Sequence, residues 1–300
     1  MRGGGTTGVT GESIGTIGEM LAPALTKAAA EIAATEAAAL ADEPDGVHQQ
    51  RVRVRRLRSI LAGFRDELDT RAAERVRVAY AEWGRELGVV RDIEVRASVA
   101  EQMLERAGVD DLDVVRRLVL AERDAYDGAH ARLVQLAGEP RAVARREMLR
   151  VFVDAPAIVG ADTPAAEVAA EVLRVQARRV GKAAHRLDGT DEAYHALRKA
   201  ARRLRYVAEA VADAAPGLYA ADVEDLAGAG DALHDSLGGH RDALLFAEHV
   251  VREGVRAARA GERSDAYAFI EAIARTDAES HLRRLPEALQ RLRAAASDLP

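Results

Sequence analysis

Cysteine is absent from this 300-residue chain, and aromatic residues make up only 4% of it. The first absence excludes disulfides, thiol chemistry and cysteine-bound metals, and it suits a reducing compartment. The second leaves little material for β-strands, and alternating apolar runs are equally scarce. No run of apolar residues is long enough to span a membrane, and residues 1–12 lack the apolar core of a signal peptide. We therefore expect an all-α protein in the cytoplasm, with residues 1–12 as a flexible leader before a helix-capping Ser13.

The abundant residues are those of long exposed helices, with 48% apolar and 31% charged side chains. Glycine, proline and aspartate delimit the helices that the sequence predicts. We expect these at about 13–41, 45–68, 70–87, 90–106, 113–137, 140–153, 164–187, 191–214, 218–237, 240–256 and 264–295. The segment DAPAIVGADTP begins at residue 154 and contains two prolines and two aspartates, which indicates a linker at 154–163. The linker divides the chain into halves at 13–153 and 164–300.

The two halves repeat two landmarks in the same order. HQQRVRVRRLR at 48–58 aligns with HALRKAARRLR at 195–205 as H-x-x-R-x-x-x-R-R-L-R. Downstream, ELGVVRD at 86–92 aligns with SLGGHRD at 236–242 as L-G-x-x-R-D. Nearly constant spacing between the copies predicts a tandem duplication, with two four-helix bundles related by a pseudo-two-fold axis. We interpret Gly88 and Gly238 as helix breaks that redirect the following segment.

On a helical wheel, the first motif places its cations beside an apolar stripe. His48, Arg51, Arg55 and Arg58 share an arc of roughly 80°, next to Val54, Leu57, Leu61 and Phe64. The second motif repeats both faces with His195, Arg198, Arg202 and Arg205, beside Ala201, Leu204, Ala208 and Val211. Like charges at this spacing destabilise a helix by a few tenths of a kcal/mol per pair. Carboxylates of other helices or a bound polyanion would offset that cost. The repeat favours the polyanion, because an internal ion-pair lattice has no reason to keep the same histidine twice.

Further cations extend the predicted basic surface. Before the second motif, a single helical stripe carries Arg174, Arg178, Lys182 and His185. Arg91 and Arg241 belong to the L-G-x-x-R-D stretches, where they either face a ligand or pair with the adjacent Asp92 and Asp242.

These motifs resemble the CHAD domain, the conserved histidine α-helical domain, from about residue 13 to the C-terminus. The resemblance implies two four-helix bundles with a basic surface or central pore that binds inorganic polyphosphate, and association with polyphosphate granules. It implies as ligands His48, Arg51, Arg55, Arg56 and Arg58, and in the second copy His195, Arg198, Arg202, Arg203 and Arg205. The position of Arg202 is often lysine in the family, and the formal charge of −6 is unusual for a polyanion binder. No alternating-glutamate stretch typical of a CYTH partner domain precedes the motif.

Three other functions remain as alternatives. A metal-dependent phosphohydrolase would need histidine ligands, but His234, His240 and His249 match no H-x-x-x-H or H-E-x-x-H pattern. Nucleic-acid binding would use similar phosphate contacts, yet aromatics for base stacking are few and no sequence-reading motif is present. A scaffold that docks an acidic partner is the third. We therefore expect a polyphosphate-binding module without cofactor, metal, catalysis, membrane segment or sequence-specific nucleic-acid binding, whose affinity rises as the pH falls through roughly 6–7.

Overall fold

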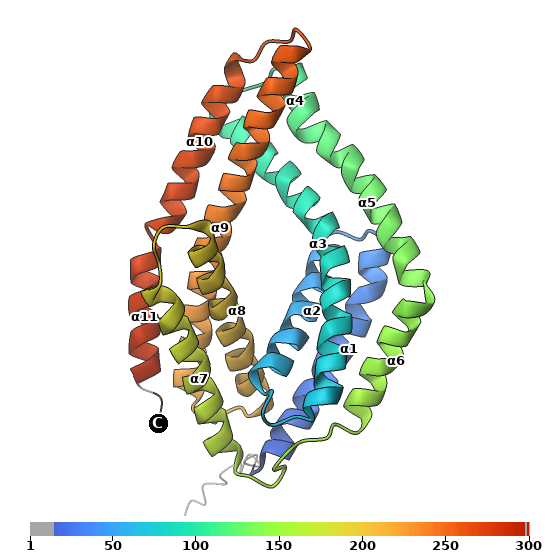
Figure 1. Ribbon diagram of the computed structural model, residues 1–300, viewed down its shortest axis with the longest axis vertical. Helices are drawn as coiled ribbons and strands as arrows, with labels where there is room; N and C mark the ends of the chain where they lie inside the picture. The colour runs from blue at the N-terminus through green and yellow to red at the C-terminus, as the bar shows by residue number, and fades with distance from the viewer. Residues whose placement is uncertain (1–14, 298, 300) are drawn as a thin grey trace, which may run out of the picture.

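The computed structural model describes residues 15–297 and 299, and within them it confirms the all-α prediction (Figure 1). The first half contains α1 (Ile17–Leu40), α2 (Gly46–Gly63), α3 (Thr70–Ala107), α4 (Leu112–Val115), the π-helix η1 (Arg116–Leu120), α5 (Ala121–Gly138) and α6 (Pro140–Asp154). The second half contains α7 (Ala165–His185), α8 (Asp191–Ala214), α9 (Ala220–Arg259), α10 (Asp265–Leu282) and α11 (Leu285–Ser297). The predicted leader and Ser13 lie outside the described residues.

Local chemistry sets several helix ends. Thr16 forms a capping box at the start of α1: its hydroxyl accepts from Glu19 N at 3.3 Å, and Glu19 Oε2 accepts from Thr16 N at 3.1 Å. The carboxylate of Asp69 caps α3, and the hydroxyl of Thr190 caps α8. Gly108 ends α3 with φ of 61°, a left-handed conformation that glycine adopts without strain.

The two long helices do not break where we predicted. Helix α3 has 38 residues and continues through Gly88, and α9 has 40 residues and continues through Gly238. One glycine inside a helix costs only about 0.5–1 kcal/mol relative to alanine, which the packing of a long helix easily offsets. At 264–295 we predicted one continuous helix, and the structure has two. Helix α10 ends at Leu282 and α11 begins at Leu285, with Pro286 in its first turn.

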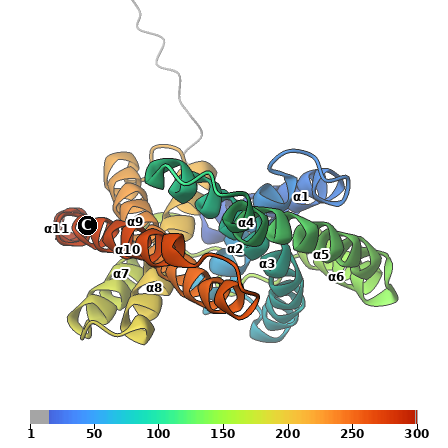
Figure 2. The ribbon, with the colours of Figure 1, turned by 90° about the horizontal axis from the view of Figure 1, so that it is seen from above.

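The halves meet at two separate places (Figures 1 and 2). Helices α2 and α8 are neighbours in the lower part of Figure 1, and α3 and α9 converge toward the opposite end, near α4, η1 and α10. One large hydrophobic core contains residues from both halves. A smaller cluster of thirteen buried residues, which we call the distal core, joins the far ends of α3 and α9 to η1 and α10. The halves therefore share their main core, and their origin by duplication stays a prediction.

The predicted linker is bound to the first half. Backbone hydrogen bonds of 2.9 Å join Val159 N to Glu67 O and Asp69 N to Ala157 O. Close by, Gly18 N donates to Ala161 O at 3.0 Å. The connection between α6 and α7 is thus held against the starts of α1 and α3. Among the helices of the described residues, none is both long and apolar enough to cross a bilayer.

Candidate functional site

The two motif helices bury their apolar faces as the helical wheel predicts. The core positions of both motifs are at most 2% exposed: Val54, Leu57, Leu61, Phe64, Ala201, Leu204, Ala208 and Val211. The helices come very close at Gly63, where a Cβ atom would lie 2.3 Å from Cγ2 of Val207. Because the core fixes these stripes, the arginines beside them are turned toward the space between the halves or toward its edges.

A cleft of about 540 Å³ lies between α2 and α3 on one side and α8 and α9 on the other. Its polar lining consists of eight arginines (51, 55, 91, 96, 198, 202, 241 and 252), three histidines (48, 195 and 234) and three aspartates (92, 235 and 242). Among the lining side chains, eight guanidinium groups stand against three carboxylates, and Glu94 and Glu122 pair with two of the guanidinium groups from outside the lining. A chain with a formal charge of −6 thus concentrates positive charge in one cleft.

The structure brings together about half of the predicted site residues. The cleft contains His48, Arg51, Arg55 and Arg91 from the first half and the matching His195, Arg198, Arg202 and Arg241 from the second. Seven others do not line it: Arg56, Arg58, Arg178, Lys182, His185, Arg203 and Arg205. Lys182 and His185 are exposed near the end of α7. The α7 stripe therefore forms a surface separate from the cleft.

Internal carboxylates neutralise three of the seven. Arg56 donates to Asp213 and lies 3.7 Å from Glu31 Oε2. Arg205 donates through Nε to Glu209 at 2.7 Å and also contacts Asp231. Arg178 lies 2.8 Å from Glu171.

Arg56 lies about 100° around the helix from Arg55, and this turns it toward Glu31 and Asp213. Internal ion pairing, the alternative considered from the sequence, is the correct description of these three arginines.

Arg58 and Arg203 belong to a different group of arginines. Burial lowers the pKa of Arg58, and the neighbouring Arg77 and Arg85 lower it further. Burial likewise lowers the pKa of Arg203, with Arg179, Arg77 and Arg58 adding to the effect. These two motif arginines therefore face other cations away from the cleft.

The L-G-x-x-R-D stretches hold the first arginine of each motif in place. A Cβ on Gly88 would lie 3.6 Å from the guanidinium of Arg51, and one on Gly238 would lie 3.3 Å from that of Arg198. The glycines thus leave room for a guanidinium to lie against the long helix. Asp92, one turn after Gly88, accepts a hydrogen bond from Arg51 at 2.7 Å. Asp92 therefore pairs with the motif arginine.

The partner of Arg91 in the first half is Glu94, at 2.8 Å. In the second half, burial raises the pKa of Asp242; Arg198 opposes this shift and Asp92 adds to it. The charge of Asp92 therefore acts on Asp242 across the cleft.

Four cleft arginines lack a carboxylate partner within the described part of the chain: Arg55, Arg198, Arg202 and Arg241. Burial lowers the pKa of Arg55 to about 9, and Arg51 and Arg202 contribute to the decrease. Burial and Arg198 lower the pKa of Arg202 to about 10. The Nε of Arg198 is buried without a hydrogen-bond partner. Crowded, partly dehydrated cations of this kind are destabilising unless an anion offsets their charge.

The histidines of the cleft are neutral at pH 7 in the unliganded protein. Burial lowers the pKa of His48, as does the nearby Arg91. Burial and Arg241 lower the pKa of His195 in the same way. A polyanion would raise both pKa values, so the two histidines become charged at a lower pH without ligand than with it.

Sequence reasoning missed four titratable residues of the cleft: Arg96, His234, Asp235 and Arg252. Arg96 follows Asp92 by one helical turn and Gly88 by two, and His234 precedes Gly238 by one turn. An uninterrupted helix through each glycine would have placed both side chains on the cleft face. The incorrect helix breaks concealed that signal. Arg252 lies nearly four turns beyond Gly238, too far for the motif to indicate it.

The chain belongs to the CHAD domain family, whose model matches residues 23–251. Two relatives are uncharacterized proteins of Mycobacterium tuberculosis, MT2285 of strain CDC 1551 and Rv2226 of strain H37Rv. Each is 28% identical over 273 residues, covering 84% of this chain. The chain spans 50% of the length of either relative.

Solved structures show the same fold. PptA from Streptomyces chartreusis superposes with a TM-score of 0.70 at 22% identity, covering 93% of this chain and 99% of PptA. The CHAD domain from the plant Ricinus communis gives a TM-score of 0.66 at 23% identity, covering 95% of this chain and 93% of that domain. At these identities the similarity establishes the architecture, and the site must be argued from this chain's own residues.

Proposed function

We propose that the cleft binds inorganic polyphosphate, and that the protein is a binding module rather than an enzyme. The observation that carries the proposal is the convergence of Arg55, Arg198 and Arg202, from both halves, in one cleft without internal counter-ions. Guanidinium groups donate paired hydrogen bonds to phosphate oxygens and remain charged at physiological pH. Family membership supports the same conclusion.

A linear polyphosphate fits the arrangement better than a single phosphate group. Motif residues one helical turn apart are separated by about 5.4 Å along the axis, so Arg51 and Arg55 present successive donors. Arg198 and Arg202 repeat this ladder on the facing helix. A flexible chain that carries one negative charge per unit could contact both ladders at once. We further propose a cytoplasmic location at polyphosphate granules.

The test compares two adjacent arginines. Arg55→Gln removes a cleft cation without a carboxylate partner, whereas Arg56→Gln removes one that Asp213 and Glu31 already neutralise. Binding of a polyphosphate of defined length is measured by titration between 50 and 200 mM salt. By the relation for single-stranded polyanions, log K falls by about 0.7 per log unit of salt for each charge neutralised. The four cleft arginines without a carboxylate partner therefore predict a wild-type slope of about −2.8.

The two variants should differ clearly. Arg55→Gln should reduce the slope by about 0.7 and weaken binding roughly 10-fold or more, because a charge-assisted hydrogen bond contributes about 1.5–3 kcal/mol. Arg56→Gln should bind within about threefold of the wild type, which corresponds to less than ~1 kcal/mol. If both variants lose the same affinity for polyphosphate, or if binding does not depend on salt, then the cleft is not the binding site.

Competition separates the nucleic-acid and scaffold alternatives from the proposal. Long-chain polyphosphate should displace duplex DNA and an acidic peptide, because neither a stiff duplex nor sparse carboxylates match two facing arginine ladders. Failure to displace them would favour a general acidic partner.

A phosphohydrolase would need a metal, and among the described residues one group has suitable spacing: Asp231, His234 and Asp235. Arg205 already donates a hydrogen bond to Asp231. Burial and the nearby Arg198, Arg202 and Arg55 lower the pKa of His234. These arginines would repel a divalent metal ion. EDTA should therefore leave polyphosphate binding unchanged, and no phosphate should be released; either effect would revive the metal-dependent alternative.

A further inference from the structure

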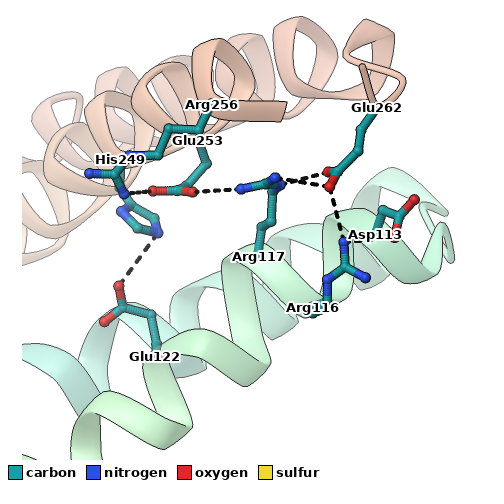
Figure 3. A network of polar contacts seen from close by, with 8 residues as sticks. All are labelled: Asp113, Arg116, Arg117, Glu122, His249, Glu253, Arg256 and Glu262. Atoms are coloured by element: carbon teal, nitrogen blue, oxygen red, sulfur yellow. Dashed lines mark hydrogen bonds and ion pairs between the residues drawn. The ribbon is translucent and has the colours of Figure 1, made fainter. Parts of the chain in front are cut away.

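A buried ionic network joins the two halves beside the distal core (Figure 3). It contains Glu122 of α5, with His249 and Glu253 of α9, whose exposed fractions are 9%, 8% and 6%. Arg117 of η1 lies 3.8 Å from Glu253 and donates to Glu262 at 2.7 Å. Three buried titratable groups in one place are unusual, because each loses hydration on burial.

His249 is the member whose bonding is incomplete. Its Nε2 is buried without a hydrogen bond, 3.5 Å from Oε1 of Glu122. The other oxygen of Glu122, Oε2, accepts a hydrogen bond from Nε of Arg96 at 3.1 Å, and Nη2 of Arg96 lies 2.9 Å from the same oxygen. Glu122 is thus held by Arg96 on one side and faces an unused histidine nitrogen on the other.

Arg96 also belongs to the cleft, as does Arg252, which precedes Glu253 on α9. The same guanidinium therefore contacts both the cleft and the buried network. A polyphosphate in the cleft and the carboxylate of Glu122 would compete for Arg96.

We propose that His249 is a proton-binding site whose occupancy is coupled to polyanion binding in the cleft through Arg96 and Glu122. The inference rests on the proposed function. When the anion attracts Arg96, Glu122 loses its partner in a site with little water. A buried unpaired carboxylate is strongly unfavourable, and His249 Nε2 is placed to compensate by taking up a proton and donating it in a hydrogen bond to Oε1.

The charged groups around His249 support proton uptake by this histidine when a polyanion binds. Burial lowers its pKa, Glu122 and Glu253 raise it, and Arg96 and Arg252 lower it. The charged and titratable groups on the packed elements are Arg96 on α3, Arg117 on η1, Glu122 on α5, Arg252, Glu253 and Arg256 on α9, Glu262 in the following loop and Tyr267 on α10. An anion in the cleft neutralises the two arginines that oppose protonation, and both carboxylates remain.

Polyphosphate binding should consequently take up a proton, and affinity should rise as the pH falls. For each unit by which binding raises the pKa of His249, the affinity for polyphosphate is about tenfold higher at a pH where His249 is protonated than at a pH where it is neutral. This effect adds to any contribution of His48 and His195, which lie in the cleft itself.

The experiment follows His249 directly. Histidine side chains are labelled with ¹⁵N, and the resonance that disappears in His249→Gln is assigned to His249. Its pKa is measured with and without saturating polyphosphate at constant ionic strength. We expect an upward shift of at least about half a unit on binding. The shift should be absent in Arg96→Gln, in which the connection is removed.

Arg106→Gln is the matched control. Arg106 lies on the same helix and also reaches across the halves, to Asp277 at 2.8 Å, but it does not line the cleft. This variant should keep the shift. An unmoved His249 in the bound wild type, or a shift that persists in Arg96→Gln, overturns the coupling.

Calorimetry in two buffers of different ionisation enthalpy gives a second measure that needs no His249 variant. Wild-type protein should take up more protons on binding than Arg96→Gln, and equal uptake overturns the proposal. The same titrations report binding itself. If polyphosphate does not bind the wild type, the proposed function fails and this inference with it; binding with equal proton uptake refutes the coupling alone.

Discussion

Gly238→Ala should make the protein more stable and a weaker binder at the same time. Glycine within a helix is less stable than alanine by about 0.5–1 kcal/mol, and α9 is helical on both sides of Gly238. The added Cβ would lie 3.3 Å from NH2, 3.6 Å from Nε and 3.8 Å from Cζ of Arg198. The guanidinium must therefore move by a few tenths of an ångström. Because no carboxylate holds it, it can move, and the helix gains stability.

Binding should weaken because Arg198 is displaced from its position in the cleft. A charge-assisted hydrogen bond contributes about 1.5–3 kcal/mol. Losing part of it, ~1 kcal/mol, corresponds to roughly a fivefold higher dissociation constant. Gly88→Ala is the matched control, since its Cβ would lie 3.6 Å or more from Arg51 in ordinary van der Waals contact. That variant should gain stability and bind as the wild type does.

Urea unfolding, followed by circular dichroism, measures the first effect, and polyphosphate titration at fixed salt measures the second. Gly238→Ala with unchanged affinity would show that the position of Arg198 does not matter for the ligand. Loss of stability in both variants would mean that the glycines serve the backbone rather than the arginines. Either result refutes the reasoning.

Three further predictions concern stability and charge. Gly63→Ala should destabilise the protein by about 1–3 kcal/mol, because its Cβ would lie 2.3 Å from Val207; an unchanged urea midpoint would contradict the close packing of α2 and α8. Asp92→Asn should tighten polyphosphate binding and steepen its salt slope by about 0.7, since Arg51 loses its 2.7 Å partner; weaker binding would mean that Asp92 positions Arg51. The free energy of unfolding should fall between pH 7.5 and 5.5, because burial holds the pKa of His249 and the motif histidines below 6.5 and the unfolded chain binds protons first; a rise would contradict that sign.

Periodicity was sufficient to predict the faces of the motif helices. Leu57 and Leu204, at the centres of the two predicted stripes, are both completely buried. The same wheel placed Arg51, Arg55 and Arg58 on one arc and Arg198, Arg202 and Arg205 on the other. The first two of each set line the cleft, whereas Arg58 and Arg205 do not. Angular position within one helix is a local property, so a single sequence determines it.

The resemblance implied a set of ligands that the structure does not bring together in one place. It included Arg56 and Arg203 because the motif contains adjacent arginines, yet neighbours on a helix face different directions. Arg205 has a favourable angle and still pairs with Glu209 and Asp231. Which carboxylate reaches a given arginine depends on tertiary packing, and no spacing rule in the sequence supplies that information.

The glycines of the repeated stretches show a third kind of error. Gly88 and Gly238 signal a local requirement for space, which is satisfied by a side chain from another helix. From the sequence alone, a helix break and a close contact look the same. Only the position of Arg51 and Arg198 distinguishes them.

The unequal size of the two cores has a mechanical consequence. One end of the cleft is anchored where α2 and α8 sit in the large core, and the other is closed by a cluster of only thirteen buried residues. Regions with few buried contacts open at lower free energy than the rest of a protein. Transient separation should therefore start between the tips of α3 and α9. Such an opening would admit the middle of a long polymer sideways, with both motif helices still in place.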